Sequence, residues 1–331
     1  MEYRTLGNSD VKVTPLTFGA WAIGGWMWGG ADRKDALQAI DKSVDLGITT
    51  IDTAAVYGFG LSEEIVGEAI AGKRNRVQVL TKYGLVWDRQ VGQFYFETVD
   101  NSGNPLSLYR YAGSESVIDE CEKSLRRLGT DYIDLYQIHW PDPTTPVEET
   151  MEAVDQLLKQ GKIRAAGVCN FSAGEMKRAD KVVSLVSDQV PYSMLRRDIE
   201  NELVPYCLEK NKSILPYSPL QRGLLTGKFR EGHNFNKGDS RPATPYFKDE
   251  NIRKTNQFLE SIRPIAESHQ ASLSQLVLRW TIQMPGITSV LVGARNTEQV
   301  GENCGALDFS LSEEEMNRIN ESLDQLRLDL T

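Results

Sequence analysis

The chain has 331 residues, of which 40% are hydrophobic and 25% charged, values typical of a globular protein large enough to bury a sizeable core. Its net charge of −9 argues against a nucleic-acid backbone as a general partner, and no apolar run approaches the length of a membrane span. The scattered cysteines, the three histidines and an N-terminus without an apolar signal region lead us to expect a reduced, cytoplasmic protein without a metal centre.

Short apolar runs alternate with amphipathic helical patterns along most of the chain. Residues 3–14 precede this rhythm and predict a β-hairpin around Gly7-Asn8-Ser9-Asp10. The predicted strands cover residues 16–21, 48–54, 77–82, 133–139, 163–170, a short strand from 188, 213–217 and 288–292. The predicted helices cover residues 33–46, 62–72, 114–128, one from about 146, 173–183, 201–210, 253–269, 272–283, one from 297 and one from 312.

Three helix starts carry recognisable capping sequences. Thr145-Pro146-Val147-Glu148 predicts a Thr N-cap with Pro at the first helical position and Glu at the third. Ser272 to Gln275 and Ser312 to Glu315 predict capping boxes, the second with a hydrophobic staple between Leu311 and Met316.

Eight strand-then-helix units with continuous apolar strands predict a parallel sheet covered on both faces. Eight units favour a closed (β/α)8 TIM barrel over an open doubly wound sheet, and the first strand lacks the G-x-G-x-x-G of a dinucleotide-binding unit. No linker divides the chain, so we expect one domain over residues 1–331. Two long loops, residues 85–113 and 220–252, are expected at the C-terminal face as lids or binding loops.

Active sites of such barrels lie at the C-terminal ends of the strands. Polar residues end six of the predicted strands, and Tyr57 follows the second strand on a glycine-flanked loop. The side chains expected to converge there are Asp52, Lys82, His139, Asn170, Gln189 and Tyr217.

The residue types of Asp52, Tyr57, Lys82 and His139 together suit acid–base catalysis. A free tyrosine titrates near about 10, and a neighbouring Lys82 ammonium is expected to lower that value. Asp52 would keep Lys82 charged, and His139 could hydrogen-bond a substrate oxygen. Such a set suits proton donation by Tyr57 to a carbonyl oxygen that is being reduced, with the hydride supplied by a cofactor.

A set of motifs in one order along nearly the whole chain strengthens this interpretation. The motifs are Asp52-Thr-Ala-Ala-Val-Tyr57-Gly58, Thr81-Lys82, the lead-in from Arg126 to Tyr136, Ile138-His139-Trp140, Gly167-Val-Cys-Asn170-Phe171, Tyr217-Ser218-Pro219-Leu220 and Gly293-Ala294-Arg295. With them the chain resembles the aldo-keto reductase superfamily, in particular its bacterial general-stress and inositol-operon reductases and, more distantly, the potassium-channel β-subunits.

The resemblance implies an NADPH-dependent reductase of small carbonyl compounds with Asp52, Tyr57, Lys82 and His139 as catalytic tetrad. It places Cys169, Asn170 and Gln189 at the nicotinamide carboxamide and Tyr217 on the ring. The other implied cofactor contacts are Ser218, Pro219, Leu220, Gly223 and Lys228 along the pyrophosphate, and Gly293, Arg295, Gln299, Glu302 and Asn303 at the adenosine end. Trp21, Trp87 and Trp140 are the predicted substrate contacts.

This sequence departs from the family pattern in two places. Cys169 stands where many members have Ser. Gly293-Ala294 stands where many have Lys-Ser, which leaves Arg295 as the main candidate for a 2′-phosphate.

Other functions remain open at the level of sequence. Lys82 could form a Schiff base in an aldolase, although a neighbouring Asp52 would keep it charged. A glycosidase needs two carboxylates, and only Asp52 ends a predicted strand with confidence. A cofactor-binding regulatory subunit with weak turnover is the non-enzyme alternative, and the substrate and the oligomeric state are left open.

Overall fold

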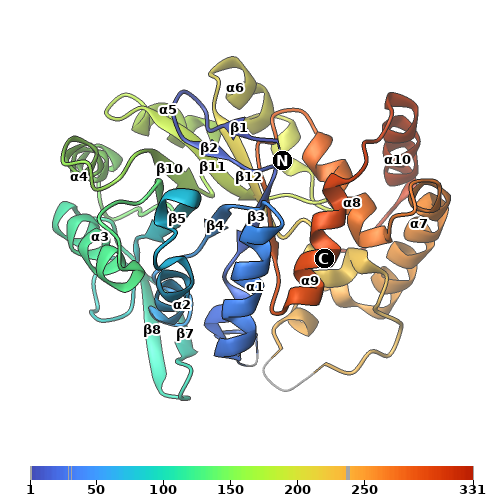
Figure 1. Cartoon of the computed structure of the whole chain (residues 1–331), viewed down its shortest axis with the longest axis horizontal. Helices are drawn as coiled ribbons and strands as arrows, with labels where there is room; N and C mark the ends of the chain where they lie inside the picture. Colours follow the sequence, from blue (N-terminus) through green and yellow to red (C-terminus); the bar gives the residue numbers. More distant parts are fainter. Residues whose placement is uncertain (1, 29, 31, 236–238, 331) are drawn as a thin grey trace.

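Eight parallel strands form a barrel at the centre of the computed structural model, which describes residues 2–28, 30, 32–235 and 239–330 (Figure 1). The strands are β3 (Leu16–Gly19), β4 (Thr50–Asp52), β5 (Gln78–Tyr83), β9 (Leu135–Ile138), β10 (Ala166–Cys169), β11 (Leu185–Pro191), β12 (Ser213–Tyr217) and β13 (Val290–Gly293). Their order in the sheet is β12-β11-β10-β9-β5-β4-β3-β13, and a parallel bridge between Ile214 and Ile287 joins the two ends of this row. The predicted (β/α)8 barrel is therefore confirmed.

Helices surround the barrel because each has one apolar face that packs on the strands. The surrounding helices are α1 (Arg33–Asp45), α2 (Leu61–Ile70), α3 (Ser114–Leu128), α4 (Val147–Lys159), α5 (Ala173–Ala179), α6 (Leu203–Glu209), α8 (Leu273–Gln283) and α9 (Thr297–Cys304). Two further helices, α7 (Asp249–Ser268) and α10 (Glu313–Gln325), pack against each other at one side of the molecule (Figure 1). None of the helices in the described ranges has the length and apolar character needed to cross a membrane.

The N-terminal hairpin closes the amino end of the barrel. Its strands, β1 (Arg4–Thr5) and β2 (Lys12–Val13), pair antiparallel as predicted. Leu6 and Val13 are buried in one cluster with inward-facing barrel residues such as Leu80. Because apolar side chains close the N-terminal end of the barrel, an open cavity can form at the C-terminal end of the strands.

Two of the three predicted capping sequences are confirmed. Ser272 and Ser312 both form capping boxes, at the starts of α8 and α10. The prediction for Thr145 is wrong, because Pro146 keeps an extended ψ of 129° and helix α4 begins only at Val147, without a side-chain cap. The Pro146 carbonyl instead accepts the N–H groups of Glu149 and Thr150.

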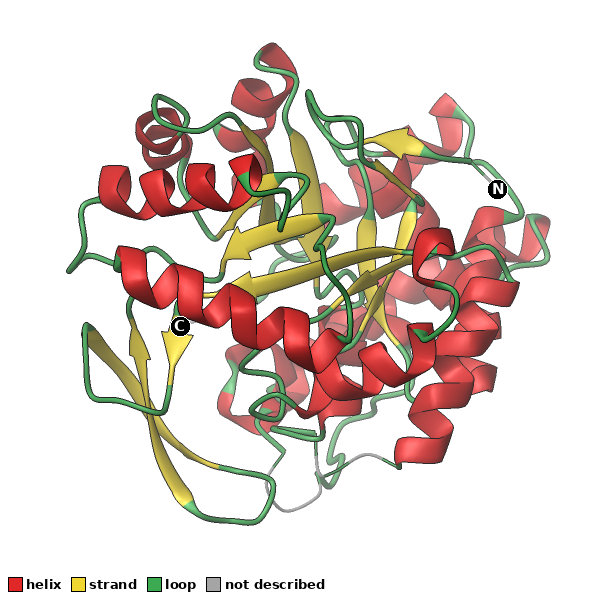
Figure 2. Cartoon of the chain, turned by 60° about the vertical axis from the view of Figure 1, so that its left-hand side comes forward, coloured by secondary structure: helices red, strands yellow, loops and turns green. Residues whose placement is uncertain are grey.

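The segment predicted as a long loop at 85–113 is instead a three-stranded antiparallel sheet. Its strands are β6 (Leu85–Val86), β7 (Gln93–Val99) and β8 (Pro105–Arg110), in the order β6-β8-β7. A turn closes the hairpin of β7 and β8, where the Asp100 carboxylate accepts the backbone N–H groups of Ser102 and Asn104. This sheet, hereafter the ribbon (residues 85–110), projects beyond the barrel (Figure 2).

The second long connection, 220–252, contains short 3-10 turns, at Gln221–Thr226, Arg241–Ala243 and Pro245–Phe247, and ends in the first turn of α7, which begins at Asp249. Residues 236–238 of this predicted loop lie outside the described residues. Phe229 and Phe247 are buried in a small apolar cluster of their own, which anchors the connection to the start of α7. The chain thus carries two large elaborations at the C-terminal ends of its strands.

Candidate active site

A cavity of about 560 Å³ opens at the C-terminal ends of the strands. It brings together nearly all the side chains that the sequence predicted to converge. The predicted residues that line it are Trp21, Asp52, Tyr57, His139, Trp140, Cys169, Asn170, Gln189, Tyr217, Ser218, Pro219, Leu220, Gly223, Lys228, Gly293, Arg295, Gln299, Glu302 and Asn303. Lys82 lies beneath the cavity and is 1% exposed.

Lys82 connects the floor of the cavity to Tyr57. Its Nζ donates to Asp52 Oδ1 at 2.6 Å, to the Thr53 carbonyl at 2.9 Å and to the Tyr57 hydroxyl oxygen at 3.2 Å. Because Tyr57 accepts this bond, its own O–H remains available to donate to a group in the cavity. The three hydrogen bonds use all three protons of an ammonium, which argues against Lys82 as the amine nucleophile of a Schiff-base aldolase.

The electrostatics of the cavity floor differ in one respect from the sequence expectation. Burial raises the pKa of Tyr57 to about 12, and the neighbouring Lys82 opposes this shift without overcoming it. The expected net lowering of the Tyr57 pKa is therefore wrong. Burial alone would lower the pKa of Lys82, but Asp52 and Tyr57 raise it above its ordinary value, so this lysine is charged.

His139 lies beside the Tyr57 ring, with ring centroids 5.6 Å apart and the planes nearly perpendicular. Burial and the nearby Lys82 charge hold the pKa of His139 well below its ordinary value. The imidazole is therefore neutral at physiological pH, and one ring nitrogen can donate a hydrogen bond to an oxygen in the cavity.

The loop that carries Tyr57 is fixed by close backbone contacts. Gly58 has φ +64°, and a Cβ there would lie 2.2 Å from the Gly24 carbonyl oxygen. The same carbonyl accepts a 2.9 Å hydrogen bond from the Asn101 side chain at the tip of the ribbon. The position of Tyr57 thus depends on two neighbouring loops as well as on its own.

Asn170 and Gln189 are held by polar contacts with other residues that line the cavity. Asn170 has φ +61°, a conformation that Asn tolerates better than most residues. Its amide donates to the His139 carbonyl at 3.0 Å and accepts from the Tyr217 hydroxyl at 2.9 Å. Gln189 donates to Asp52 Oδ2 at 2.8 Å, which connects these residues to the floor.

The segment after β12 has an unusual backbone. Ser218, Gln221, Arg222 and Gly223 all have positive φ values, between +46° and +97°. Each non-glycine residue in this region costs about 1–2 kcal/mol, and such strain concentrates at functional sites. This strained segment forms one wall of the cavity.

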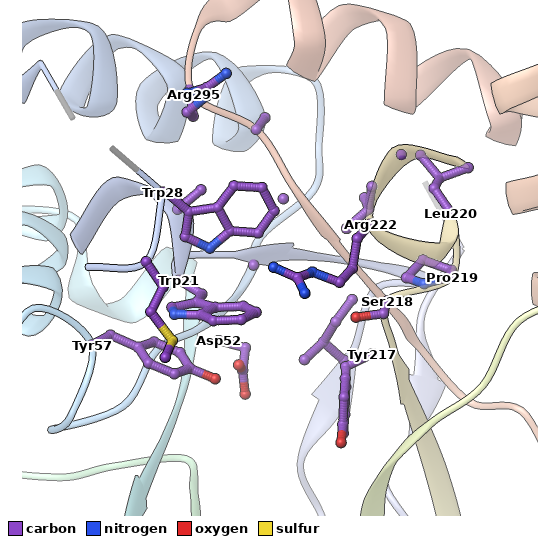
Figure 3. Close-up of a pocket in the computed structure, with 18 of the residues that line it drawn as sticks. Trp21, Trp28, Asp52, Tyr57, Tyr217, Ser218, Pro219, Leu220, Arg222 and Arg295 are labelled. Carbon is purple, nitrogen blue, oxygen red and sulfur yellow. The ribbon is translucent and has the colours of Figure 1, made fainter. Parts of the chain in front are cut away.

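Two arginines that line the cavity, Arg222 and Arg295, lie away from Tyr57. In Figure 3 Arg295 lies at one end of the pocket and Tyr57 and Asp52 at the other, with Trp28 and Arg222 on facing walls. The Arg222 Nε is buried and has no hydrogen-bond partner among the described residues. The sequence predicted Arg295 here but missed Arg222 and Arg241, which come from short 3-10 turns in the connection 220–252.

Aromatic residues form the remaining wall. Trp21 stacks on Tyr57 at a centroid distance of 6.0 Å, whereas Trp87 packs on Phe59 and does not line the cavity. We therefore no longer expect Trp87 to contact a substrate. The lining residues that the sequence prediction did not include also comprise Trp26, Met27 and Trp28 on the β3–α1 loop and Tyr95 and Phe96 on the ribbon. The sequence does carry a signal for the β3–α1 loop, because Trp21, Trp26 and Trp28 follow the first barrel strand within eight residues.

Comparisons with known proteins agree with this geometry. Residues 15–324 match the model of the Aldo/keto reductase family. The chain is 38% identical over 327 residues to the aldo-keto reductase YhdN of Bacillus subtilis, covering 98% of this chain and 94% of the relative. It is 37% identical to the NADH-specific methylglyoxal reductase of Escherichia coli over 97% and 98% of the two chains.

A solved structure, the glycerol dehydrogenase AKR11B4 from Gluconobacter oxydans, superposes with a TM-score of 0.88 at 37% identity, covering 99% of this chain and 98% of that one. Family match, relatives and fold all extend over nearly the full length. The chain therefore belongs to the aldo/keto reductase family and is an oxidoreductase that reduces carbonyl groups with a nicotinamide cofactor, NADH or NADPH.

Proposed function

We propose that this chain reduces the carbonyl group of a small aldehyde or ketone with NADPH, and that Tyr57 is the proton donor. The observation that carries the proposal is the set of hydrogen bonds from one Lys82 ammonium to both Asp52 and Tyr57. This arrangement leaves the Tyr57 O–H free and places a positive charge beside the oxygen that becomes negative as it loses its proton.

The lining of the cavity fits a nicotinamide dinucleotide. At one end the Arg295 side chain forms no ion pair within the described residues, which suits a phosphate. Along one wall the buried, unpartnered Arg222 N–H and the strained segment from Ser218 suit a pyrophosphate. At the other end the amides of Asn170 and Gln189 suit a carboxamide, with Cys169 and Tyr217 beside them.

The residues around the reacting carbonyl would act together. Bound NADPH would supply the hydride. The neutral His139 would donate a hydrogen bond that orients the carbonyl oxygen. Tyr57 would transfer its proton to that oxygen as negative charge develops there, while Lys82 stabilises the phenolate and Asp52 keeps Lys82 charged.

Steady-state oxidation of NADPH with 4-nitrobenzaldehyde, a reactive aldehyde, tests the proposal directly. We expect a turnover of roughly 1 s⁻¹ or more, an ordinary value for enzymes. Turnover orders of magnitude lower, together with tight NADPH binding, would favour the cofactor-binding regulatory subunit instead.

The preference for NADPH rests on Arg295, with Gln299, Glu302 and Asn303 beside it. A carboxylate near the adenosine ribose would favour NADH by accepting a hydrogen bond from the free 2′-hydroxyl. Here Glu302 accepts a hydrogen bond from the Ser272 hydroxyl through one carboxylate oxygen. The proposed preference therefore rests on Arg295, whose side chain forms no ion pair among the described residues, and it would distinguish this chain from the NADH-specific relative.

Replacing Arg295 by Ala is expected to weaken NADPH binding by about 1.5–3 kcal/mol, the value of a hydrogen bond to a charged group, and NADH binding much less. Fluorescence titration of both cofactors measures the difference. Arg76→Ala is the matched control, because Arg76 is exposed just before β5, at the opposite end of the barrel. Equal losses for the two cofactors would show that Arg295 does not contact the 2′-phosphate.

A further inference from the structure

The ribbon contributes one wall of the cavity through an irregularity in its pairing. Phe94 pairs with Tyr109 and Phe96 with Leu108, so Tyr95 is an extra residue that forms a β-bulge. Bulges redirect side chains, and here both Tyr95 and Phe96 line the cavity although they are neighbours in a strand. The ribbon therefore presents a built surface to the substrate end of the site.

Arg110 lies on the same face of the ribbon as Leu108, two residues away along β8. Its guanidinium carbon lies 4.0 Å from the centre of the Tyr95 ring and 4.9 Å from that of Trp140. Both rings line the cavity, and Trp140 directly follows His139 in the chain. The cation is thus packed against two rings of the cavity wall, one of which adjoins His139 in the chain, although Arg110 itself is not among the residues that line the cavity.

Among the described residues this cation has its two aromatic partners but no ion-pair partner. Within the described ranges no acceptor is hydrogen-bonded to the Arg110 side chain, and its Nε is buried without a partner. A buried donor left unpaired is costly, which indicates that another group satisfies it during function. An arginine stacked on aromatic faces keeps the N–H groups along its edge free, in the geometry that accepts a carboxylate with two parallel hydrogen bonds.

We propose that Arg110 forms a carboxylate subsite, and that this enzyme prefers aldehydes or ketones that carry a carboxylate away from the reacting carbonyl. The inference rests on the proposed carbonyl reduction and adds a substrate class to it. The molecule carries a net charge of −9, so a cation beside the substrate end of the cavity would favour such substrates locally. Tyr95 and Trp140 hold the cation in place and shield it from water.

The test compares 4-formylbenzoate with its neutral methyl ester, which share the same aldehyde. We expect the ratio of kcat/KM for the carboxylate to that for the ester to fall about tenfold or more in Arg110→Leu. Arg110→Lys should give an intermediate ratio, because it keeps the charge and loses the planar fork. Arg76→Leu, which removes the same charge at the far end of the barrel, should keep the original ratio.

An unchanged ratio in Arg110→Leu would overturn the proposal, as would an equal fall in Arg76→Leu, which would indicate a long-range effect of net charge. Calorimetric titration of the alcohols, 4-(hydroxymethyl)benzoate and its methyl ester, provides a second measurement that needs no turnover. The Arg110 variant should lose its affinity for the carboxylate relative to the ester by a similar factor. Absence of turnover with both aldehydes would contradict the proposed reduction, while the binding ratio would still decide the role of Arg110.

Discussion

The Tyr57→Phe variant is expected to bind NADPH as tightly as the unchanged protein and to lose at least about two orders of magnitude in kcat. The substitution removes the proton donor and almost no volume, so the stacking of the ring on Trp21 is kept. With the pKa of Tyr57 raised to about 12, the hydroxyl is protonated throughout the physiological range, and its loss cannot be compensated by a change of pH there. Stopped-flow or steady-state kinetics with a saturating aldehyde measures the loss.

Tyr83→Phe is the matched control for this experiment. It also removes one tyrosine hydroxyl, but that hydroxyl is buried, has no partner among the described residues and lies outside the cavity. We expect kcat to stay within a few-fold of its original value in this variant. Near-normal turnover in Tyr57→Phe would mean that another group delivers the proton, and the assignment of Tyr57 would have to be abandoned.

The arrangement of strand ends was the part of the site that the sequence could predict. A parallel barrel brings the C-terminal end of every strand to one rim, so Asp52, His139 and Tyr217 had to converge once eight strand-helix units were recognised. Helix starts could also be predicted where the capping hydrogen bonds join residues that are close in the sequence. The Ser272 and Ser312 capping boxes fixed the starts of α8 and α10 because each involves only four consecutive residues.

Features that depend on tertiary contacts could not be predicted in this way. The sequence predicts a loop at the ribbon because three consecutive aromatic residues, Phe94 to Phe96, hide the two-residue period of a strand, and the bulge at Tyr95 explains that run. The direction of the Tyr57 pKa shift was wrong because burial outweighs Lys82, and burial is known only from the fold. Arg222 and Arg241 reach the cavity from irregular backbone, which leaves no periodic pattern in the sequence.

Lys82→Met is expected to lower kcat by at least about two orders of magnitude and to destabilise the fold by about 3–5 kcal/mol. The turnover is lost because no positive charge then stabilises the Tyr57 phenolate. Stability is lost because the Asp52 carboxylate, 2% exposed, keeps hydrogen bonds from neutral amides such as that of Gln189 but has no counter-charge among the described residues. Urea unfolding followed by circular dichroism measures the free energy of unfolding of both proteins.

The pH dependence of this loss follows from the charge that is left behind. Burial raises the pKa of Asp52, and Lys82 is the strongest influence that lowers it, so removing Lys82 raises the Asp52 pKa further. A carboxyl whose pKa is higher in the folded than in the unfolded chain loses folding free energy as the pH rises above the unfolded value. The stability deficit of Lys82→Met should therefore be smaller at about pH 5 than at about pH 8.

Pairing Lys82→Met with Asp52→Asn separates the structural from the chemical role of the ion pair. The neutral amide has about the same volume as the carboxylate, and it leaves no unpaired charge buried. The double variant should therefore recover most of the lost free energy of unfolding. Its stability should also differ little between about pH 5 and about pH 8. Turnover should stay as low as in the single variant, because the Tyr57 phenolate still lacks its ammonium partner. A deficit that is equal at both pH values, or a double variant no more stable than Lys82→Met, would contradict a charged Asp52 in the floor of the cavity, whereas recovered turnover would contradict the role given to Lys82.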